Sequence, residues 1–281
     1  MIYEICGHTE AGPVRERNED HILIGSWIRN RGWLCLALSA ADEQIDRAGL
    51  LLAVADGIGG LAGGATASRI ALDALVTSLL RTTPATGSAA IQAADLEAAM
   101  QQVNAAVHEA QATHAEDAAM GTTLSAVLLT AADHWVLHVG DSRVLRIRNG
   151  FVKVLTRDDT LAEQLYQAGM DKTIADANPD GGTLVNWIGS TRMQANIRTV
   201  PALEAGDQLV ICSDGLHGFL SEDAIVASLQ DPCRPLRDAI AAMIDAALAA
   251  GSTDNVSLLV LRVSDEGSAP TADTEDTHGH A

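Results

Sequence analysis

The sequence predicts an α+β fold, in which helices and strands occur in separate groups. Two long alanine-rich segments with helical periodicity come early, a run of short apolar segments separated by turns follows, and two more helices come late. Consecutive short strands are typical of antiparallel hairpins, whereas a regular alternation of strand and helix would indicate a parallel sheet. The 281 residues, 47% of them hydrophobic, are enough for one large domain or two small ones.

The first half of the chain contributes one clear strand and two helices. The apolar run 50–55 is short and ends at turn-forming residues, so it predicts a buried strand. The segments 65–80 and 95–114 are long, rich in alanine and helically periodic, so they predict two consecutive helices. Residues 27–48 separate two strands and have mixed polarity, which is typical of either a long hairpin or an insertion.

The second half begins with a meander of strands. Asn149-Gly150 strongly favours a two-residue hairpin turn, so the strands on its two sides are expected to pair. A short helix is expected over 160–168 and an irregular segment over 171–194. The other expected elements are strands at 121–130, 134–140, 142–148, 151–155, 196–200, 207–213 and 255–263 and helices at 221–229 and 234–250.

The composition excludes several classes of partner. The formal net charge of -19 argues against non-specific binding to nucleic acids or anionic membranes, because both depend on basic side chains. The four cysteines are far apart and form no C-x-x-C pair, so we expect free thiols in a reducing compartment. The sequence shows no basic leader and no apolar run of membrane-spanning length. We therefore expect a cytoplasmic protein without nucleic-acid or membrane partners.

The C-terminal segment 265–281 differs from the rest of the chain. It contains five acidic residues, no basic residue and no aliphatic residue larger than alanine. Such a segment cannot bury enough apolar surface to offset the entropy of ordering. We therefore expect one domain over 1–264 and a disordered acidic tail over 265–281.

Acidic residues beside glycine or small polar residues recur across the chain, mostly where a strand-like run ends. A single such aspartate is ordinary turn chemistry. Several together can instead converge as oxygen ligands for divalent cations, and three anionic ligands are enough for two ions that keep several waters. The residues concerned are Glu19, Asp20, Asp56, Asp141, Asp214 and Asp254.

A nucleotide-binding loop is an alternative interpretation of one of these segments. Gly57-x-Gly59-x-x-Ala62 follows a strand and matches the glycine pattern of dinucleotide-binding proteins. That fold needs a second parallel strand ending in an acidic residue about 20 positions later. Residues 65–81 have a helical pattern instead, and Asp56 would repel a pyrophosphate. Nucleotide binding is therefore the weaker alternative.

The segments Arg-x-x-x-Glu-Asp, Ala-Asp-Gly-Ile-Gly-Gly, Val-Gly-Asp-Ser, Cys-Ser-Asp-Gly and Thr-Asp-Asn, in this order, resemble the metal-dependent protein serine/threonine phosphatases (type 2C) in their bacterial form. The resemblance covers about residues 7–263. It implies a four-layer α-β-β-α sandwich of two antiparallel sheets flanked by helix pairs. It also implies hydrolysis of phosphoserine and phosphothreonine by a metal-bridged hydroxide, with two tightly bound Mn²⁺ or Mg²⁺ ions and a third, weaker one.

The resemblance also implies a set of metal ligands. By its pattern, Asp56, Asp214 and Asp254 hold the first ion, and Asp56 together with the carbonyl of Gly57 holds the second. Asp141, with Asp214, corresponds to the weaker third site of bacterial relatives. Asp56 and Asp214 thereby count among the catalytic residues as well as the ligands.

The same resemblance assigns the residues around the phosphate. The spacing of Arg, three residues and then Glu-Asp selects Arg15 rather than Arg17, and its guanidinium would grip phosphoryl oxygens bidentately. Glu19 and Asp20 would act through waters. Many eukaryotic relatives carry a histidine directly after the metal-binding Asp-Gly, but this chain has Ile58, so the general acid is unassigned.

Other parts of the resemblance are less complete. Bacterial relatives often have Asp-His-Ser after the hairpin, where this chain has 157–160 as Arg-Asp-Asp-Thr, so the role of that loop is open. The segment 171–194 corresponds to a mobile flap beside the active site. The implied partner is a phosphorylated protein, and such phosphatases often oppose a Ser/Thr kinase. The alternative is a catalytically weak pseudophosphatase that only binds phosphoproteins, although retention of Asp56, Asp214 and Asp254 argues against it.

Overall fold

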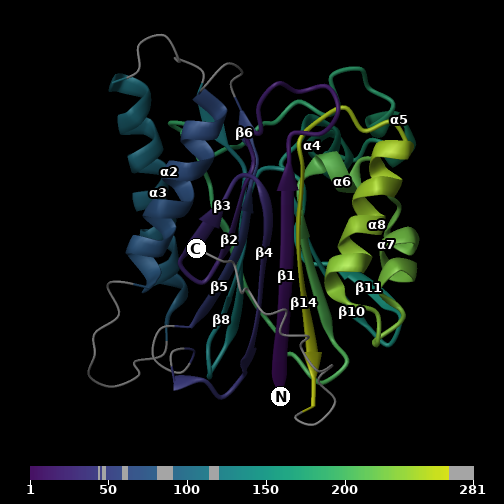
Figure 1. The fold of residues 1–281 in the computed structure, drawn as a ribbon. Coiled ribbons are helices and arrows are strands. Elements are labelled where there is room, and N and C mark those ends of the chain that lie inside the picture. The colour runs from purple at the N-terminus through teal and green to yellow at the C-terminus, as the bar shows by residue number, and fades with distance from the viewer. Residues whose placement is uncertain (44, 46–48, 59–62, 81–90, 114–119, 266–281) are drawn as a thin grey trace, which may run out of the picture.

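The computed structural model describes residues 1–43, 45, 49–58, 63–80, 91–113 and 120–265 (Figure 1). These residues form two six-stranded sheets and one short two-stranded ladder. The first sheet contains, in spatial order, β11 (Phe151–Val154), β10 (Arg143–Arg148), β13 (Gln208–Cys212), β14 (Val256–Ser264), β1 (Ile2–Glu10) and β4 (Gly32–Ser39). The second sheet contains β12 (Asn196–Val200), β9 (His134–Val139), β8 (Leu124–Leu129), β5 (Leu50–Ala55), β2 (His21–Ile24) and β3 (Trp27–Arg29). The ladder pairs β6 (Gly57–Ile58) with β7 (Gly121–Thr122).

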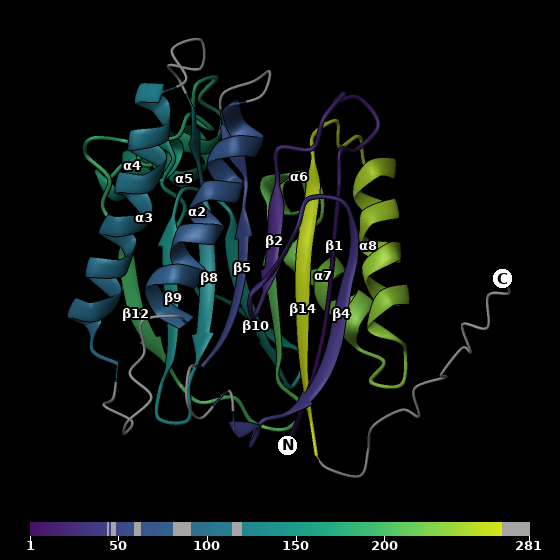
Figure 2. The same ribbon diagram turned by 60° about the vertical axis from the view of Figure 1, so that its left-hand side comes forward.

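The two sheets stack face to face and helices cover both outer faces, as Figures 1 and 2 show. The helices α2 (Gly63–Leu80) and α3 (Ala93–Thr113) pack on the second sheet. The helices α7 (Glu222–Leu229) and α8 (Leu236–Ala249) pack on the first sheet. Three further short helices have described bounds: α4 (Leu161–Gln167), α5 (Lys172–Asp176) and α6 (Asp214–His217). The predicted four-layer α-β-β-α sandwich is confirmed.

Strand β5 shows why a continuously apolar run belongs in the centre of such a sandwich. Alternate residues of a strand point to opposite faces of the sheet. Leu50, Leu52 and Val54 pack between the two sheets, whereas Leu51 and Ala53 pack under α2 and α3. All of β5 is buried because both faces of its sheet are covered.

The antiparallel pairing has two consequences for the predictions. Asn149 and Gly150 both have positive φ, 54° and 77°, and join β10 to β11 in the predicted hairpin. All strand pairs among the described residues are antiparallel. Strand β5, which precedes the glycine pattern, pairs antiparallel with β2 and β8. The parallel unit that a dinucleotide-binding loop requires is thus not found among the described residues, and the nucleotide-binding alternative is wrong; Gly59 and Ala62 of the pattern lie outside those residues.

Two segments, 27–48 and 171–194, differ from the structure that the sequence predicts for them. Within 27–48, β3 pairs with β2 and β4 pairs with β1, so the two arms belong to different sheets and do not form a long hairpin. The segment 171–194 is not wholly irregular, because α5 begins after Asp171, whose carboxylate caps it by accepting the N–H of Thr173 (2.9 Å).

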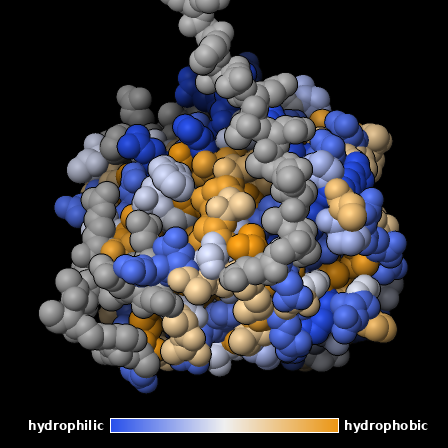
Figure 3. All heavy atoms as spheres, turned by 60° about the horizontal axis from the view of Figure 1, so that its bottom comes forward, coloured by the Kyte–Doolittle hydropathy of each residue, from blue (hydrophilic) through white to orange (hydrophobic). Residues whose placement is uncertain are grey.

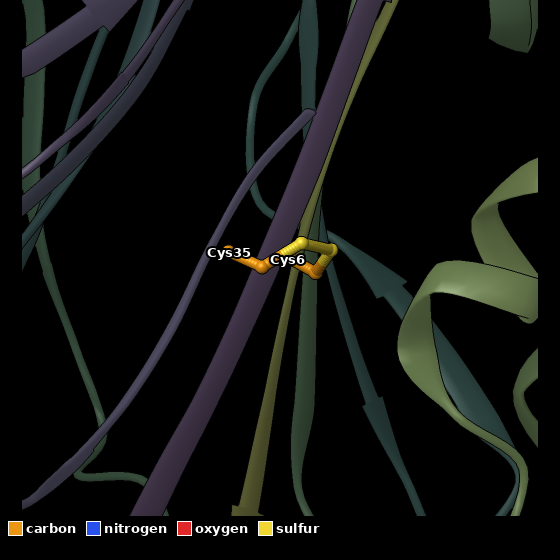
Figure 4. The surroundings of a disulfide bond; sticks show 2 residues. All are labelled: Cys6 and Cys35. Carbon is orange, nitrogen blue, oxygen red and sulfur yellow. A yellow bond between two sulfur atoms is a disulfide. The ribbon is translucent and has the colours of Figure 1, made fainter. Parts of the chain in front are cut away.

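The expectation of four free thiols is also wrong. Cys6 of β1 and Cys35 of β4 form a disulfide, with a Cα–Cα distance of 4.0 Å (Figure 4). The antiparallel register places these residues directly opposite each other, which a separation of 29 residues in the sequence does not indicate. The other two cysteines are free; Cys212 is buried and Cys233 is exposed.

The ends of the sandwich differ in character. Figure 3, in which the lower end of Figure 1 comes forward, shows hydrophobic residues in the middle of the face and hydrophilic residues around them. The opposite end, at the top of Figure 1, carries the acidic segments.

Among the described residues no helix has the length and apolarity to cross a membrane. The predicted tail lies outside the described residues, except for Asp265.

Candidate active site

Strand ends bring the acidic segments to one end of the sandwich. Strands β5, β9 and β13 finish there and β2 and β14 begin there, so the residues that flank them meet. A cavity of about 890 Å³ opens at this end. Its wall includes seven of the eight predicted site residues, namely Arg15, Glu19, Asp56, Gly57, Asp141, Asp214 and Asp254.

Asp20, the eighth residue, is not part of the cavity wall and is fully buried. Its Oδ2 accepts a hydrogen bond from Ser213 Oγ (3.0 Å), whereas its Oδ1 has no hydrogen-bond partner among the described residues. Burial, and then the charge of Asp214, raise the pKa of Asp20 to about 7. A buried carboxylate oxygen without a partner is costly, so this position favours a nearby positive charge.

Asp56 directly follows β5 and is fixed through its backbone. Its N–H donates to Thr123 Oγ1 (3.0 Å), and its carbonyl accepts from the Thr123 N–H and the Thr122 hydroxyl (2.8 Å each). Burial raises the pKa of Asp56 well above its ordinary value, and the charges of Asp20 and Asp214 raise it further. The two threonines were not predicted as site residues; their only signal is a polar pair at the start of an apolar run.

Gly57 lies against the first turn of α2. A Cβ atom at this position would lie 2.4 Å from the carbonyl carbon and oxygen of Gly64 and 2.6 Å from the carbonyl oxygen of Glu19. Real Cβ atoms do not approach backbone this closely, so the requirement for glycine comes from packing between segments. The close approach holds the Gly57 backbone next to Asp56.

Asp214 and Asp254 come from adjacent strands of the first sheet, β13 and β14. Asp214 opens α6, and burial, followed by the charge of Asp254, raises its pKa. Asp254 Oδ2 accepts a hydrogen bond from Arg15 Nη2 at 2.6 Å. Both partners are exposed, at 56% and 39% for their side chains, so this ion pair is reachable from solvent.

Asn255 ties the loop 11–19, which carries Arg15, to the start of β14. Its Oδ1 accepts the N–H of Glu19 (2.8 Å), and its Nδ2 donates to the carbonyls of Ala11 and Arg17 (3.0 Å each). Arg17 therefore contributes a backbone carbonyl here, and of the two arginines Arg15 and Arg17 it is Arg15 that is part of the cavity wall. Asn255 was not predicted as a site residue, although it directly follows Asp254 in the sequence.

Asp141 follows β9 and lines the same cavity. Burial, and then the charge of Asp214, raise the pKa of Asp141 to about 7. His217, at the end of α6, donates from Nε2 to the carbonyl of Asp141 (3.1 Å). The single turn of α6 therefore carries Asp214 at its start and contacts the Asp141 segment through His217 at its end.

The donor chemistry of the cavity fits divalent cations such as Mn²⁺ or Mg²⁺. Four carboxyl groups, those of Asp20, Asp56, Asp141 and Asp214, have raised pKa values because they are buried near one another, and cations would relieve that repulsion. Among the described residues, no three acidic, histidine or cysteine side chains already have the geometry of a closed ligand cluster. The fit therefore rests on oxygen donors, charge and the partnerless Asp20 Oδ1.

The segment 171–194 closes one side of the cavity. Among its residues, Gly182, Thr183, Leu184, Trp187 and 189–192 line the wall. Backbone hydrogen bonds join Thr122 and Ile188 in both directions (3.1 and 2.9 Å), so the segment is attached to β7.

Sequence comparisons place these features in a known group. Residues 24–250 match the family model described as protein phosphatase 2C. The serine/threonine protein phosphatase PstP of Mycobacterium tuberculosis is 29% identical over 266 residues, which cover 94% of this chain and 46% of PstP. The serine/threonine phosphatase stp of Listeria innocua is 28% identical over 259 residues, covering 90% of this chain and 93% of stp.

Solved structures agree with the sequence matches. The crystal structure of the M. tuberculosis phosphatase PstP superposes with a TM-score of 0.75 and 27% identity, covering 94% of this chain and all (100%) of that one. A second structure of its catalytic domain, in complex with two manganese ions, gives a TM-score of 0.70 with the same identity and coverage, 27%, 94% and 100%. This chain spans about half (46%) of the length of the complete mycobacterial relatives.

Proposed function

Because the chain belongs to the protein phosphatase 2C family, we propose that it is a metal-dependent protein phosphatase that hydrolyses phosphoserine and phosphothreonine. One observation carries the proposal. Asp56, Asp141, Asp214 and Asp254, which follow or precede four different strands, line one cavity together with Arg15. We further propose that residues 1–264 form one catalytic domain, with 171–194 as its flap.

The proposed ligands are those that the family resemblance implies, and all of them line the cavity. Asp56, Asp214 and Asp254 would hold one cation, Asp56 and the carbonyl of Gly57 would hold a second, and Asp141 with Asp214 would hold a weaker third. Divalent cations, when bound in such a site, lower the pKa of water and so supply a nucleophile at neutral pH. The mycobacterial catalytic domain with two manganese ions supports this choice of metal.

The chain's own residues bind and orient the substrate around that nucleophile. The Arg15 guanidinium, exposed at the cavity, binds the phosphoryl oxygens bidentately and offsets their charge. Arg15 Nη2 donates to Asp254 Oδ2; if Asp254 held a cation, its carboxylate would be engaged there and the guanidinium would be free for phosphate. Glu19 and Asp20 hold ordered waters beside the ligands. Ile58 cannot donate a proton, so no residue of this chain is assigned as the general acid.

Hydrolysis of p-nitrophenyl phosphate and of a phosphothreonine peptide, with Mn²⁺ and with EDTA, tests the proposal. Turnover that depends on Mn²⁺ or Mg²⁺ and stops with EDTA is expected for both substrates. Binding of the phosphopeptide without turnover under any metal condition would instead favour the pseudophosphatase. Full turnover after extensive chelation would contradict the metal-dependent mechanism.

The natural partner is proposed from the same chemistry. A phosphorylated protein is the substrate, and a Ser/Thr kinase that produces it is the opposing enzyme. The cytoplasmic location expected from the sequence stays a prediction.

Replacing Arg15 with alanine is expected to reduce kcat/KM roughly 10- to 100-fold, mainly through KM. The reason is the loss of a hydrogen bond to a charged group, worth ~1.5–3 kcal/mol. Steady-state kinetics of Arg15→Ala with p-nitrophenyl phosphate measure this. The matched control is Arg17→Ala, because Arg17 is not part of the cavity wall and its bond to Asn255 is made by the backbone carbonyl, which the substitution keeps. A large rise of KM in Arg17→Ala but not in Arg15→Ala would contradict the assignment.

The stabilisation by Mn²⁺ is expected to increase between pH 6 and pH 8. Asp20 and Asp141 have folded-state pKa values of about 7, well above those of an unfolded chain. In the metal-free protein their stabilising contribution is therefore fully present below about pH 4 and is lost as the pH rises through about 7. Cations must displace these protons at pH 6 but not at pH 8.

The measurement is the difference in Tm between samples with Mn²⁺ and with EDTA, at the two pH values. Burial lowers the pKa values of His21 and His217 to about 4. Both histidines therefore stay neutral in the folded protein at pH 6 and at pH 8. Asp141→Asn removes one of the titrating groups and is expected to reduce the pH dependence of the Tm difference. An equal Mn²⁺-induced shift at pH 6 and pH 8 in the unmodified chain would contradict the explanation.

A further inference from the structure

The loop 157–160 clasps the turn that carries Asp141. Asp158 accepts three hydrogen bonds from Arg143, two from Nε (3.0 and 3.3 Å) and one from Nη2 (2.7 Å). Asp159 holds Gly140 from both sides, because its N–H donates to the Gly140 carbonyl (2.7 Å) and its Oδ2 accepts the Gly140 N–H (2.9 Å). The residue directly before Asp141 is thus bound twice by Asp159.

The same carboxylate also reaches the flap. Oδ2 of Asp159 accepts a second hydrogen bond, from Asn186 Nδ2 (2.7 Å), and the carbonyl of Asp159 accepts the N–H of Val185 (2.9 Å). Asn186 in turn closes the loop 186–194, since its Nδ2 donates to the Gln194 carbonyl (2.8 Å) and its Oδ1 accepts the Gln194 N–H (3.1 Å). We call residues 186–194 the flap loop.

The flap loop forms part of the wall of the catalytic cavity, through Trp187 and residues 189–192. One oxygen atom of Asp159 therefore joins the turn before a proposed ligand to the wall that faces the substrate. Gly140 cannot be replaced by a larger residue without strain, because its φ is +103° and a Cβ there would lie 2.6 Å from the Cβ of Thr123. Because Gly140 and Asn186 both donate to Oδ2 of Asp159, a shift of the turn would disturb Asp159, and a shift of Asp159 would disturb Asn186.

We propose that Asp159 is a positioning residue that couples the flap loop to Asp141, so that cation binding at Asp141 and ordering of the flap loop favour each other. The coupling is reciprocal by thermodynamic necessity, because each event stabilises the same arrangement of Asp159. The inference rests on the proposed function, which makes Asp141 a cation ligand. It gives a role to the loop 157–160, where the sequence departs from the Asp-His-Ser pattern.

The experiment measures two quantities in the full chain. One is the hydrogen–deuterium exchange of peptides covering 183–194, with EDTA and across a Mn²⁺ titration. The other is the Mn²⁺ concentration at half-maximal hydrolysis of p-nitrophenyl phosphate. In the unmodified chain, Mn²⁺ is expected to slow exchange in the flap loop. In Asp159→Ala the flap loop is expected to exchange about tenfold faster, and the half-maximal Mn²⁺ concentration is expected to rise about tenfold, because a charge-assisted link is lost.

Two variants separate coupling from local support. Asp159→Asn keeps an oxygen that can accept from both Gly140 and Asn186, so it is expected to restore most of both quantities. Asn186→Ala leaves the bonds between Asp159 and Gly140 intact and removes the hydrogen bond that Asp159 accepts from the flap loop. It is still expected to raise the half-maximal Mn²⁺ concentration severalfold, and it decides the question if Asp159→Ala does not fold.

Asp171→Ala is the matched control in the same segment. It removes the exposed N-cap of α5, so it should speed exchange at 172–176 and leave the Mn²⁺ dependence unchanged. A flap loop that loosens in Asp159→Ala or Asn186→Ala without any change in the Mn²⁺ midpoint would overturn the coupling. If the unmodified chain lacked phosphatase activity, the proposed function would fail, and the effect of Mn²⁺ on exchange would still decide this inference.

Discussion

Asp214→Ala is expected to lower kcat by about 10²-fold or more, the largest effect on catalysis that we predict for a single side chain. Asp214 opens α6 at the wall of the cavity, and its pKa is raised by burial and by Asp254. Its carboxylate is proposed to contact both the first and the third cation. Loss of this carboxylate is therefore expected to weaken the binding of the cations, which in the proposed function lower the pKa of the attacking water.

The measurement combines kinetics with calorimetric titration of Mn²⁺. Asp223→Ala is the matched control, because Asp223 is an exposed aspartate in the first turn of the next helix, α7. The control should keep both activity and Mn²⁺ stoichiometry. Unchanged Mn²⁺ binding and kcat in Asp214→Ala would remove Asp214 from the ligand set.

Gly215→Ala is expected to lower the Tm by about 5–10 °C and to reduce activity strongly. A Cβ on Gly215 would lie 1.9 Å from the carbonyl oxygen of Asn255. Overpacking of this kind costs ~1–3 kcal/mol or more, and the affected atom belongs to the backbone, which cannot rotate away as a side chain can. The backbone next to Asp254 must move away from Asp214, so the two proposed ligands separate.

The displacement should also reach the loop that carries Arg15, because Asn255 makes hydrogen bonds to the backbone of Glu19 and Arg17. Thermal unfolding and Mn²⁺-dependent hydrolysis measure the two effects. Gly182→Ala is the control for stability, since its added methyl group meets no atom within 4 Å and its φ is not in the left-handed region. A Gly215→Ala protein with an unchanged Tm and full activity would show that the clash is absorbed locally.

Much of the secondary structure was predictable because its causes are local. The helical period of α2 and α3 and the Asn149-Gly150 turn are properties of neighbouring residues, and both predictions are confirmed. The apolar run of β5 was recognisable for the same reason. Strand β1 was not predicted, and neither were the separate partners of β3 and β4, because pairing between strands depends on distant segments.

The sequence by itself determined which residues are the candidates for the chemistry. The order and neighbours of Asp56, Asp141, Asp214 and Asp254 were sufficient to predict a shared acidic site, and the structure lines one cavity with all four. Arg15 was selected over Arg17 by the spacing of the family pattern that the sequence resembles. These features are visible in the sequence because each proposed ligand is set by the type of residue at the end of one strand.

Only the tertiary structure decided what holds those residues in place. The disulfide of Cys6 with Cys35, the anchoring by Asn255 and the double hydrogen bond at Asp159 join segments from different strands and loops. A hydrogen bond or a disulfide depends on distances of a few ångströms, and these distances follow from the order and register of all the strands together. No local pattern records them, so they emerge only once both sheets are assembled.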